Sequence, residues 1–405
     1  MKRILFVDDE PRILEGLQRI LRPRRGEWDM NFADSGQAAL VAMETASYDV
    51  VVTDMKMPKM DGATLLKIVR ERYPCVLRIV LSGYTDIEAS YRAVPVAHQF
   101  LLKPCEPDKL HSAIDRGTCL IDLLNHKGLA GMIGSLRDLP SAPEAILGLK
   151  VELESPEPSL RRIVSIIERD VAIAAKVLQM VNSAFFGNPR EVTDIETAVT
   201  LIGANTLRHL VLSVEAFRSF TLKKKVSGFA LEEFDEHAQL TSRIAAGIAE
   251  QEELPTAMAI AALLHDVGKL VLAECTPEQF SRAWEEANGA HEPLHVVEER
   301  NSGVGHAEVG AYLLGLWGLP YPVIEAVAHH HRPRRAKPQK FDMVVGVYVA
   351  NVLARQVAPA PSGFHASEIL EVDTNLLESF HVEGKVAAWK KMAEEQTCKQ
   401  QKAKA

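Results

Sequence analysis

Five side chains suited to phosphoryl chemistry each stand at the end of a short apolar segment. Asp8 and Asp9 follow RILFV, Asp54 ends DVVVTD, Ser82 ends LRIVLS and Lys103 ends HQFLLK. Clustered carboxylates repel one another unless a cation lies among them, and an oxygen-preferring ion such as Mg²⁺ relieves that repulsion. With a hydroxyl and an ammonium beside it, Asp54 is able to attack a phosphoryl group and form an acyl phosphate. Taken singly, each aspartate is equally compatible with a solvated helix cap.

A second set of chemically capable residues lies further along the chain. The run LLHDVGKL places His265 and Asp266 next to each other in an apolar, helix-like segment. Neutral imidazoles and carboxylates bind transition ions, which activate water against a phosphoester. Lys269 lies about one helical turn after His265, where an ammonium is able to hold a substrate phosphate. Because a single histidine in such a run is more often a packing residue than a ligand, the doublet alone does not define a site.

The segments that carry the first set alternate between apolar runs and helical patterns from residue 3 to about 124. This alternation predicts an α/β fold with a doubly wound parallel sheet. In such sheets the carboxyl ends of the strands meet at one edge, and ligands bind beyond that edge. We therefore expect the five side chains to converge there.

From about residue 126 the pattern changes to successive amphipathic helices, such as SLRRIVSIIERDVAIAAKVLQMVNSA, without a clear strand. The sequence thus predicts an α/β domain followed by an all-α region, one built only of helices. The proline- and glycine-containing segment APAPSG at 358–363 separates a last helical segment from the helices before it. The Lys- and Gln-rich end is expected to be a frayed tail.

The composition sets broad limits on function. A chain of 405 residues, 47% of them hydrophobic, is long enough for two or three domains. The net charge of -8 provides no overall basic field for nucleic acid or for an anionic membrane. The cysteines show no CxxC spacing, which indicates a reduced protein, and no apolar stretch approaches the roughly 18 residues of a membrane span. We therefore expect a cytoplasmic protein without a membrane or nucleic-acid partner.

The order of the first set resembles the receiver domain of bacterial response regulators. The resemblance rests on the acidic pair after the first strand, Asp54 in DMKMPKMDG, Ser82 after the fourth strand and Lys103 before proline after the fifth. It covers residues 3 to about 122 and implies a five-stranded fold of the flavodoxin type. It further implies that a sensor histidine kinase phosphorylates Asp54 and that Phe100 is an aromatic switch residue, although Phe100 is also compatible with plain core packing.

The second region resembles HDOD, the HD-related output domain. The resemblance rests on the Leu-Pro opening, ERDVAIAAKVLQMVNSAFFG, IETAVTLIGANTLRHLVLS, LLHDVGKL, VGHAEVGAYLLGLWGLP and AVAHHHRP. Metal-dependent phosphohydrolases of the HD superfamily carry their ligands in a similar order along their helices. The candidate metal ligands that this order implies are His237, His265, Asp266, His306, His329, His330 and Asn351.

Three departures weaken the enzyme interpretation. Asn351 stands where the superfamily has an aspartate, and an amide is a neutral, weaker ligand. The segment RPRRAKPQKFD replaces the acidic, glycine-rich signature of the branch that hydrolyses cyclic di-GMP. The HDOD family is regarded as regulatory and often lacks catalytic residues. Glu233, four residues before His237, lies on the same predicted helix face and is able to supply a replacement carboxylate.

These observations predict a receiver domain over 1–124, an HDOD domain over 125–340 and a C-terminal helical extension with a tail over 341–405. The leading hypothesis is a two-component response regulator whose phosphorylation on Asp54 controls the HDOD output. The alternative is a receiver-controlled, metal-dependent phosphohydrolase. The cofactors that the two resemblances imply are Mg²⁺ in the receiver and, if the enzyme-like ligands are used, a divalent transition metal in the HDOD domain. Partners are a sensor histidine kinase, other signalling proteins or a small nucleotide; homodimerisation, HDOD metal binding and turnover stay open.

Overall fold

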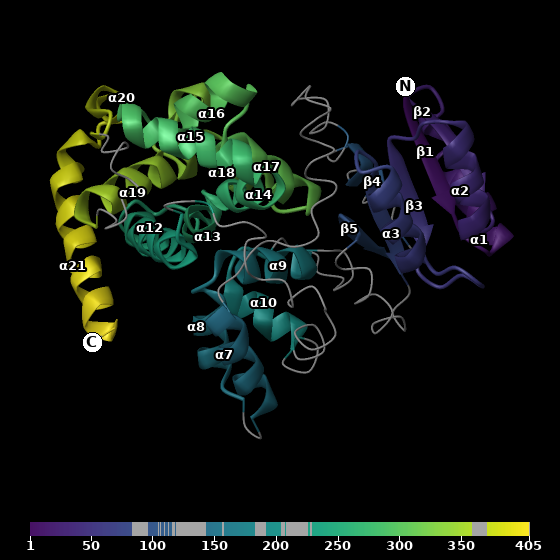
Figure 1. Ribbon diagram of the computed structural model, residues 1–405, viewed down its shortest axis with the longest axis horizontal. Coiled ribbons are helices and arrows are strands. Elements are labelled where there is room, and N and C mark those ends of the chain that lie inside the picture. The colour runs from purple at the N-terminus through teal and green to yellow at the C-terminus, as the bar shows by residue number, and fades with distance from the viewer. Residues whose placement is uncertain are drawn as a thin grey trace.

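The computed structural model contains an N-terminal α/β unit and a larger helical region (Figure 1). The order predicted from the sequence, an α/β unit followed by helices, is confirmed. The domain boundary predicted near residue 124 lies outside the described residues. The structure describes residues 1–404 with gaps at 83–95, 104, 106, 109, 112, 116–117, 119–142, 156–157, 183–191, 204–206, 208–225, 227–228 and 359–370.

The α/β unit is built on a parallel sheet with the strand order β2-β1-β3-β4-β5. The strands are β1 (Lys2–Val7), β2 (Trp28–Ala33), β3 (Val50–Asp54), β4 (Leu77–Ser82) and β5 (Gln99–Leu102). The described helices of this unit are α1 (Pro11–Ile20), η1 (Arg22–Arg24), α2 (Gly36–Thr45) and α3 (Gly62–Arg72). β3 and β4 are buried along their whole length, as expected for strands covered on both faces. The register pairs Asp54 with Leu81 and Ser82 with Leu102, so the polar strand ends share one edge.

The helical region has two groups of helices. The first consists of α7 (Pro143–Glu154), α8 (Leu160–Ile167), α9 (Val171–Asn182) and α10 (Ile195–Ile202). The second consists of α12 (Leu231–Gln251), α13 (Ala257–Leu264), α14 (Val267–Cys275), α15 (Pro277–Ala290), α16 (Leu294–Ser302), α17 (His306–Leu316), α18 (Tyr321–His329), η4 (Pro333–Ala336), α19 (Met343–Val357), α20 (Thr374–Glu378), η5 (Glu383–Lys385) and α21 (Val386–Lys404). None of the helices in the described part of the chain is long and apolar enough to cross a bilayer.

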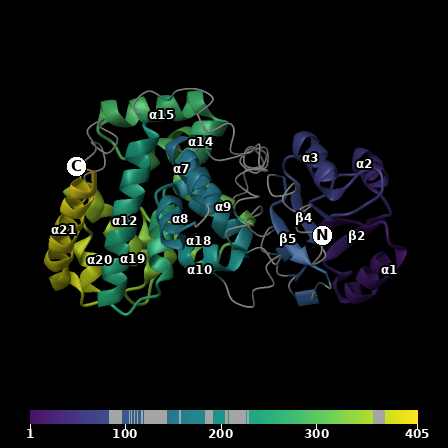
Figure 2. The same cartoon turned by 90° about the horizontal axis from the view of Figure 1, so that it is seen from below.

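The helix α12 is the centre of the second group, because α13, α19 and α21 all pack against it. The helix α17 packs between α14 and α18. Figures 1 and 2 both place the sheet at one end of the molecule and α21 at the other. Trp389 of α21 is fully buried and stacks on Phe341 at a centroid distance of 5.3 Å. The described part of segment 341–405 therefore packs on the same helical body as α12.

Two buried aspartates meet at the N-terminus of α9. Asp170 Oδ1 accepts the backbone N–H of Ile173 at 2.8 Å, and Asp235 Oδ1 of α12 accepts that of Val171 at 3.1 Å. Burial and then the neighbouring Asp170 carboxylate raise the pKa of Asp235 well above its usual value. The pair therefore joins α9 to α12 and is most stable with a proton on Asp235.

Asp235→Asn is expected to stabilise the helical region at alkaline pH by on the order of 1 kcal/mol. A carboxyl group whose pKa is raised by folding stabilises the fold below its unfolded pKa, and this contribution is lost as the pH rises through the folded pKa. Asparagine keeps the acceptor for Val171 and does not ionise, so the loss does not occur. Urea unfolding from about pH 5 to about pH 9 measures the effect, and equal pH slopes for both proteins would contradict it.

Candidate phosphoacceptor and metal sites

The first site lies at the carboxyl edge of the sheet. Asp8 follows β1, Asp54 ends β3 and Lys103 follows β5. The Lys103 ammonium lies 2.6 Å from Asp8 Oδ2 and also contacts Asp54 Oδ1. The remaining oxygens accept backbone N–H groups, Asp8 Oδ1 from Glu10 at 2.9 Å and Asp54 Oδ2 from Lys56 at 2.8 Å. One lysine therefore bridges the two carboxylates, whose orientation the backbone fixes.

Burial and charge act in opposite directions on the pKa values of Asp54 and Lys103. Burial raises the pKa of Asp54, and the hydrogen bond and charge of Lys103 offset only part of that increase. Burial lowers the pKa of Lys103, but Asp54 and Asp8 outweigh burial and raise it above its usual value. Lys103 therefore stays a cation beside Asp54, where it is able to offset charge on a transferred phosphoryl group.

Ser82 and Asp9 complete the predicted set at this edge. Ser82 is buried, and its carbonyl oxygen accepts the Lys103 backbone N–H at 2.8 Å. Asp9 is partly exposed. The carboxylate oxygens of Asp8, Asp9 and Asp54, all of them described residues, do not form a group within 4.8 Å of one another. The structure thus places Lys103, rather than a gathering of three acids, at the centre of the site.

The loop after β3 is held close to Asp54. A β-carbon at Gly62 would lie 2.2 Å from the Asp54 carbonyl oxygen, so only glycine allows α3 to start here. Asp61 caps α3 by accepting the Thr64 N–H at 2.8 Å. The side chain of Phe100, the predicted switch residue, lies outside the described residues, although its backbone belongs to β5.

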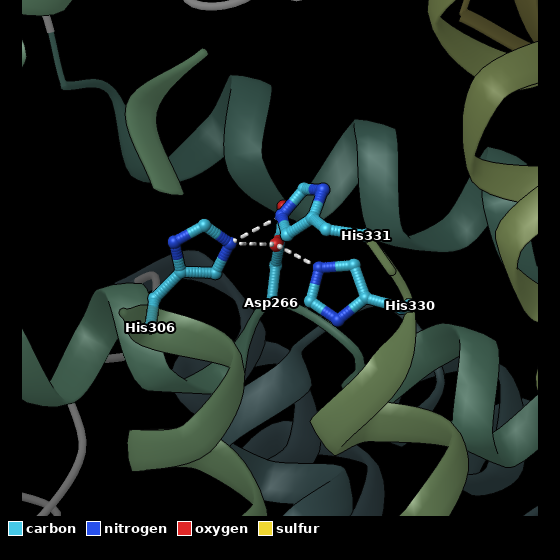
Figure 3. A group of neighbouring side chains, drawn as sticks. All are labelled: Asp266, His306, His330 and His331. Carbon is cyan, nitrogen blue, oxygen red and sulfur yellow. Dashed lines mark hydrogen bonds and ion pairs between the residues drawn. The ribbon is translucent and has the colours of Figure 1, made fainter. Parts of the chain in front are cut away.

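The second site is a cluster of histidines around Asp266 (Figure 3). Its members come from α12, from the turn between α13 and α14, from the start of α17 and from the end of α18. Two groups of ligand atoms each lie within 4.8 Å of one another, and Asp266 belongs to both. The first group is His237, His265 and Asp266, and the second is Asp266, His306, His330 and His331.

Hydrogen bonds determine which ring nitrogens face Asp266. His265 Nδ1 lies 2.6 Å from the Ala262 carbonyl oxygen, and His330 Nδ1 lies 2.7 Å from that of Val327. A carbonyl oxygen only accepts, so each Nδ1 carries a proton, and in a neutral ring the lone pair then lies on Nε2. The His265 Nε2 atom lies 3.3 Å from Asp266 Oδ2, and the His330 Nε2 atom lies 3.4 Å from Asp266 Oδ1.

Hydrogen-bond acceptor atoms therefore face one another at the centre of the cluster. Burial raises the pKa of Asp266, but His265 and Lys269 outweigh burial and hold that pKa well below its usual value. Burial lowers the pKa of His330 to about 3, which leaves its ring neutral. His265 Nε2, His330 Nε2 and Asp266 Oδ1 are buried without a hydrogen bond from the described part of the chain. A cation on the Oδ1 side would satisfy His330 Nε2 and Asp266 Oδ1, so the donor set there fits a metal ion, whereas His265 Nε2 belongs to the other ligand group.

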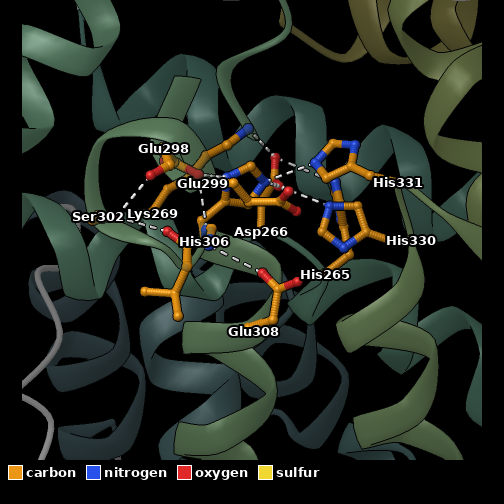
Figure 4. A network of polar contacts seen from close by, with 12 residues as sticks. His265, Asp266, Lys269, Glu298, Glu299, Ser302, His306, Glu308, His330 and His331 are labelled. Carbon is orange, nitrogen blue, oxygen red and sulfur yellow. Dashed lines mark hydrogen bonds and ion pairs between the residues drawn. The ribbon is translucent and has the colours of Figure 1, made fainter. Parts of the chain in front are cut away.

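Charged residues surround the cluster (Figure 4). Lys269 Nζ lies 2.7 Å from Asp266 Oδ2, and Arg355 Nη2 lies 3.9 Å from the same oxygen. Glu298 Oε2 lies 2.6 Å from His306 Nδ1 and accepts the His306 backbone N–H at 2.8 Å. Burial lowers the pKa of His306, but Glu298 and Asp266 outweigh it and raise the pKa above its usual value. Lys269, predicted as a phosphate ligand, thus directs its charge to Asp266.

A close helix contact brings His306 to Asp266. A β-carbon at Gly268 would lie 1.9 Å from the His306 carbonyl oxygen, so a larger residue would separate α14 from α17. The glycine of LLHDVGKL therefore has a structural role in the site. It lets the first residue of α17 reach the doublet at the start of α14.

The structure brings most of the predicted ligands together. Asn351 Oδ1 lies 3.0 Å from His237 Nε2, a separation that fits a hydrogen bond and also two ligands of one ion. His331 belongs to the cluster, whereas His329 ends α18, is partly exposed and lies outside both groups. Glu233 also lies outside both groups. The position proposed for His329 is thus filled by His331, because α18 ends at His329 and the chain then turns toward Asp266.

The sequence interpretation missed three further residues near the cluster. The rings of His295 and His331 stack with centroids 4.1 Å apart and an interplanar angle of 11°. His295 and Glu298 are three residues apart on α16, a spacing that places both on one helix face. Arg355 follows Asn351 by four residues on α19 and is 2% exposed. The three- and four-residue spacings were the sequence signal that could have placed Glu298 with His295 and Arg355 with Asn351 on shared helix faces.

Comparisons with known proteins find both parts of the chain. Residues 4–115 match the response regulator receiver domain, and residues 139–333 match the HDOD domain. An uncharacterized protein of Treponema pallidum is 32% identical over 235 residues, which is 56% of this chain and 44% of that protein. The hydrogenase transcriptional regulatory protein HoxA of Cupriavidus necator is 39% identical over 109 residues, 26% of this chain and 22% of its own. The MmoQ response regulator of Methylococcus capsulatus is 22% identical with a TM-score of 0.47, over 60% of this chain and 97% of that one.

The chain spans less than half the length of these two curated relatives. Each of the two sites lies within one matched segment, Asp54 in the first and Asp266 in the second. The chain therefore belongs to the response regulators and joins an N-terminal receiver domain to an HDOD domain.

Proposed function

We propose that Asp54 accepts a phosphoryl group from a sensor histidine kinase and that the HDOD domain carries the output. The observation that supports this most is the contact of the Lys103 ammonium with both Asp8 and Asp54 at the strand ends. An Asp54 oxygen attacks the phosphorus of a phosphohistidine, the P–N bond breaks, and the departing nitrogen keeps the electron pair and takes up a proton. Lys103 offsets the negative charge on the transferred oxygens.

The same edge offers ligands for Mg²⁺. Although their oxygens do not all lie within 4.8 Å of one another in the structure, Asp8, Asp9 and Asp54 would move together to hold the ion, which supplies further positive charge to the phosphoryl oxygens. Removal of Mg²⁺ with EDTA is expected to abolish phosphorylation of the full chain by a small phosphodonor such as phosphoramidate. Intact mass measures the label, and undiminished labelling in EDTA would contradict the role of Mg²⁺.

One helix connects the two sites and supports control of the output by the receiver. The helix α17 begins at His306 in the cluster, and a β-carbon at Gly318, just beyond its other end, would lie 3.8 Å from Gln99 Cδ of β5. The strand β5 leads to Lys103, which contacts Asp54. We infer that phosphorylation shifts β5 against α17 and so changes the cluster. Titration with Co²⁺, with and without phosphodonor, measures this coupling, and identical affinities would contradict it.

A second candidate function is phosphoester hydrolysis by the HDOD domain. The unsatisfied acceptors His265 Nε2, His330 Nε2 and Asp266 Oδ1 favour it. A metal ion held there lowers the pKa of a bound water and makes it a nucleophile. The test is turnover of a phosphodiester panel by the metal-loaded chain. Turnover that is lost in Asp266→Asn supports the function, and equal turnover in both proteins would contradict it.

His331→Gln is expected to weaken Co²⁺ binding by about 10- to 100-fold, because His331 contributes a ligand atom to the cluster. The matched control is His329→Gln, since His329 is a neighbouring histidine outside the cluster. We expect this control to stay within about twofold of the wild type. Calorimetric titration compares the affinities; a loss in His329→Gln as large as that in His331→Gln would contradict the assignment.

A further inference from the structure

We propose that the HDOD domain binds one divalent transition ion per chain, on the Oδ1 side of Asp266. Lys269 and Arg355 take the place of a second ion on the Oδ2 side. The inference rests on the metal binding proposed above and specifies the number and position of the ion.

The Oδ1 side of Asp266 has a full set of ligands. Asp266 Oδ1 lies 3.2 Å from His306 Nε2 and 3.4 Å from His330 Nε2. His306 Nε2 lies in turn 2.8 Å from His331 Nε2. Three imidazoles and one carboxylate are a common ligand set for a transition ion.

The Oδ2 side of Asp266 already has cations. Lys269 Nζ lies 2.7 Å and Arg355 Nη2 lies 3.9 Å from this oxygen. These two residues are 1% and 2% exposed, so solvent screens their charges little. Asn351, whose Oδ1 lies 3.0 Å from His237 Nε2, adds only a neutral amide on this side. A divalent ion on this side would meet two fixed positive charges and would have to share its one carboxylate with them.

The fixed charges of the cluster balance before any ion binds. Asp266 and Glu298 are the acids within it, and Lys269 and Arg355 are the cations. Each divalent ion adds two positive charges to a buried site, where uncompensated charge is costly. The second carboxylate, Glu298, supports His306 and so lies on the Oδ1 side.

Exposure to solvent also favours an ion on the Oδ1 side of Asp266. The first ligand group, His237, His265 and Asp266, is buried throughout. In the second group, His331 is partly exposed. An ion on the Oδ1 side would therefore lie nearer to solvent, and a hydroxide ligand there would offset part of its charge.

Counting of bound ions on the full chain tests the proposal. The chain is saturated with Co²⁺ in excess Mg²⁺, which occupies the oxygen ligands of the receiver, and is then dialysed and analysed for metal. The visible absorption of Co²⁺ reports nitrogen ligands. We expect one Co²⁺ per chain, and we expect His330→Gln to weaken its binding at least about tenfold more than His237→Gln does. The control His329→Gln is expected to retain one ion.

Removal of the internal cations should create the second site. We expect two Co²⁺ ions per chain in the variant that combines Lys269→Met, Arg355→Met and Asn351→Asp, because a carboxylate then replaces the amide where two cations have been removed. Lys269→Met with Asn351→Asp alone is a milder variant with the same expected count. Circular dichroism establishes that each variant is folded before its ions are counted.

The outcomes separate this inference from the metal binding on which it rests. Two ions in the wild type, or a larger loss in His237→Gln than in His330→Gln, would overturn the inference and leave metal binding intact. Absence of any Co²⁺ from the wild type would overturn both. One ion in both folded variants with altered charges would overturn the role given to Lys269 and Arg355.

Discussion

Replacement of Asp54 with asparagine is expected to reduce labelling of the chain by a small phosphodonor at least about 100-fold, because an amide is not a nucleophile toward phosphorus. Asparagine has nearly the same shape and keeps an oxygen to accept the Lys56 N–H, so the loop after β3 should stay in place. Lys103 loses one of its two carboxylate partners and keeps Asp8. Intact mass of the full chain, recorded with phosphodonor and Mg²⁺, gives the labelled fraction.

The matched control for this variant is Asp34→Asn. Asp34 follows β2 at the same edge of the sheet, is exposed and accepts a hydrogen bond from the Ser35 hydroxyl at 3.0 Å. It should be labelled like the wild type. Labelling of Asp54→Asn at the wild-type level, or a comparable loss in Asp34→Asn, would exclude Asp54 as the acceptor.

Asp266→Asn is expected to destabilise the HDOD domain by about 3 kcal/mol, because it leaves the buried Lys269 ammonium without its carboxylate partner. The same change should abolish Co²⁺ binding, since Asp266 belongs to both ligand groups. Urea unfolding gives the change in the free energy of unfolding, and Co²⁺ titration of the folded variant gives the affinity.

The combination of Asp266→Asn with Lys269→Met separates the two effects. With both partners of the Lys269 ion pair removed, stability should return part of the way to that of the wild type, because Arg355, 3.9 Å from the lost carboxylate oxygen, still loses its contact with Asp266. Binding of Co²⁺ should stay lost. A single variant that is as stable as the wild type, or a double variant that binds Co²⁺ normally, would contradict the dual role of Asp266.

The receiver site could largely be predicted from the sequence, because strand ends are marked by a change from apolar to polar residues. Asp8, Asp54 and Lys103 stand at such changes, and parallel pairing then brings them to one edge. The direct contacts of Lys103 could not be predicted. The sequence placed its ammonium at the same edge as the acids, and the structure shows that it contacts both Asp8 and Asp54. The conformation of a long side chain decides this, and residue spacing does not encode it.

The histidine cluster was less predictable because its residues come from several helices. The choice between His329 and His331 depends on the residue at which α18 ends, and helix ends are the least certain part of a helical pattern. A neighbouring carboxylate was expected from Glu233, but Glu298 of α16 supplies it instead. Packing between helices far apart in sequence determines which acid reaches the site, and periodicity alone carries no information on it.

The measurement that tests the central claim most directly is chemical mapping of the phosphoryl group on the wild-type chain. Borohydride reduces an aspartyl phosphate to homoserine, which peptide mass spectrometry then locates. We predict homoserine at position 54 in the sample treated with phosphodonor and Mg²⁺, and none in the untreated sample. Homoserine at Asp8 or Asp9, or a phosphoryl group on a histidine of the Asp266 cluster with position 54 unmodified, would contradict phosphorylation of Asp54.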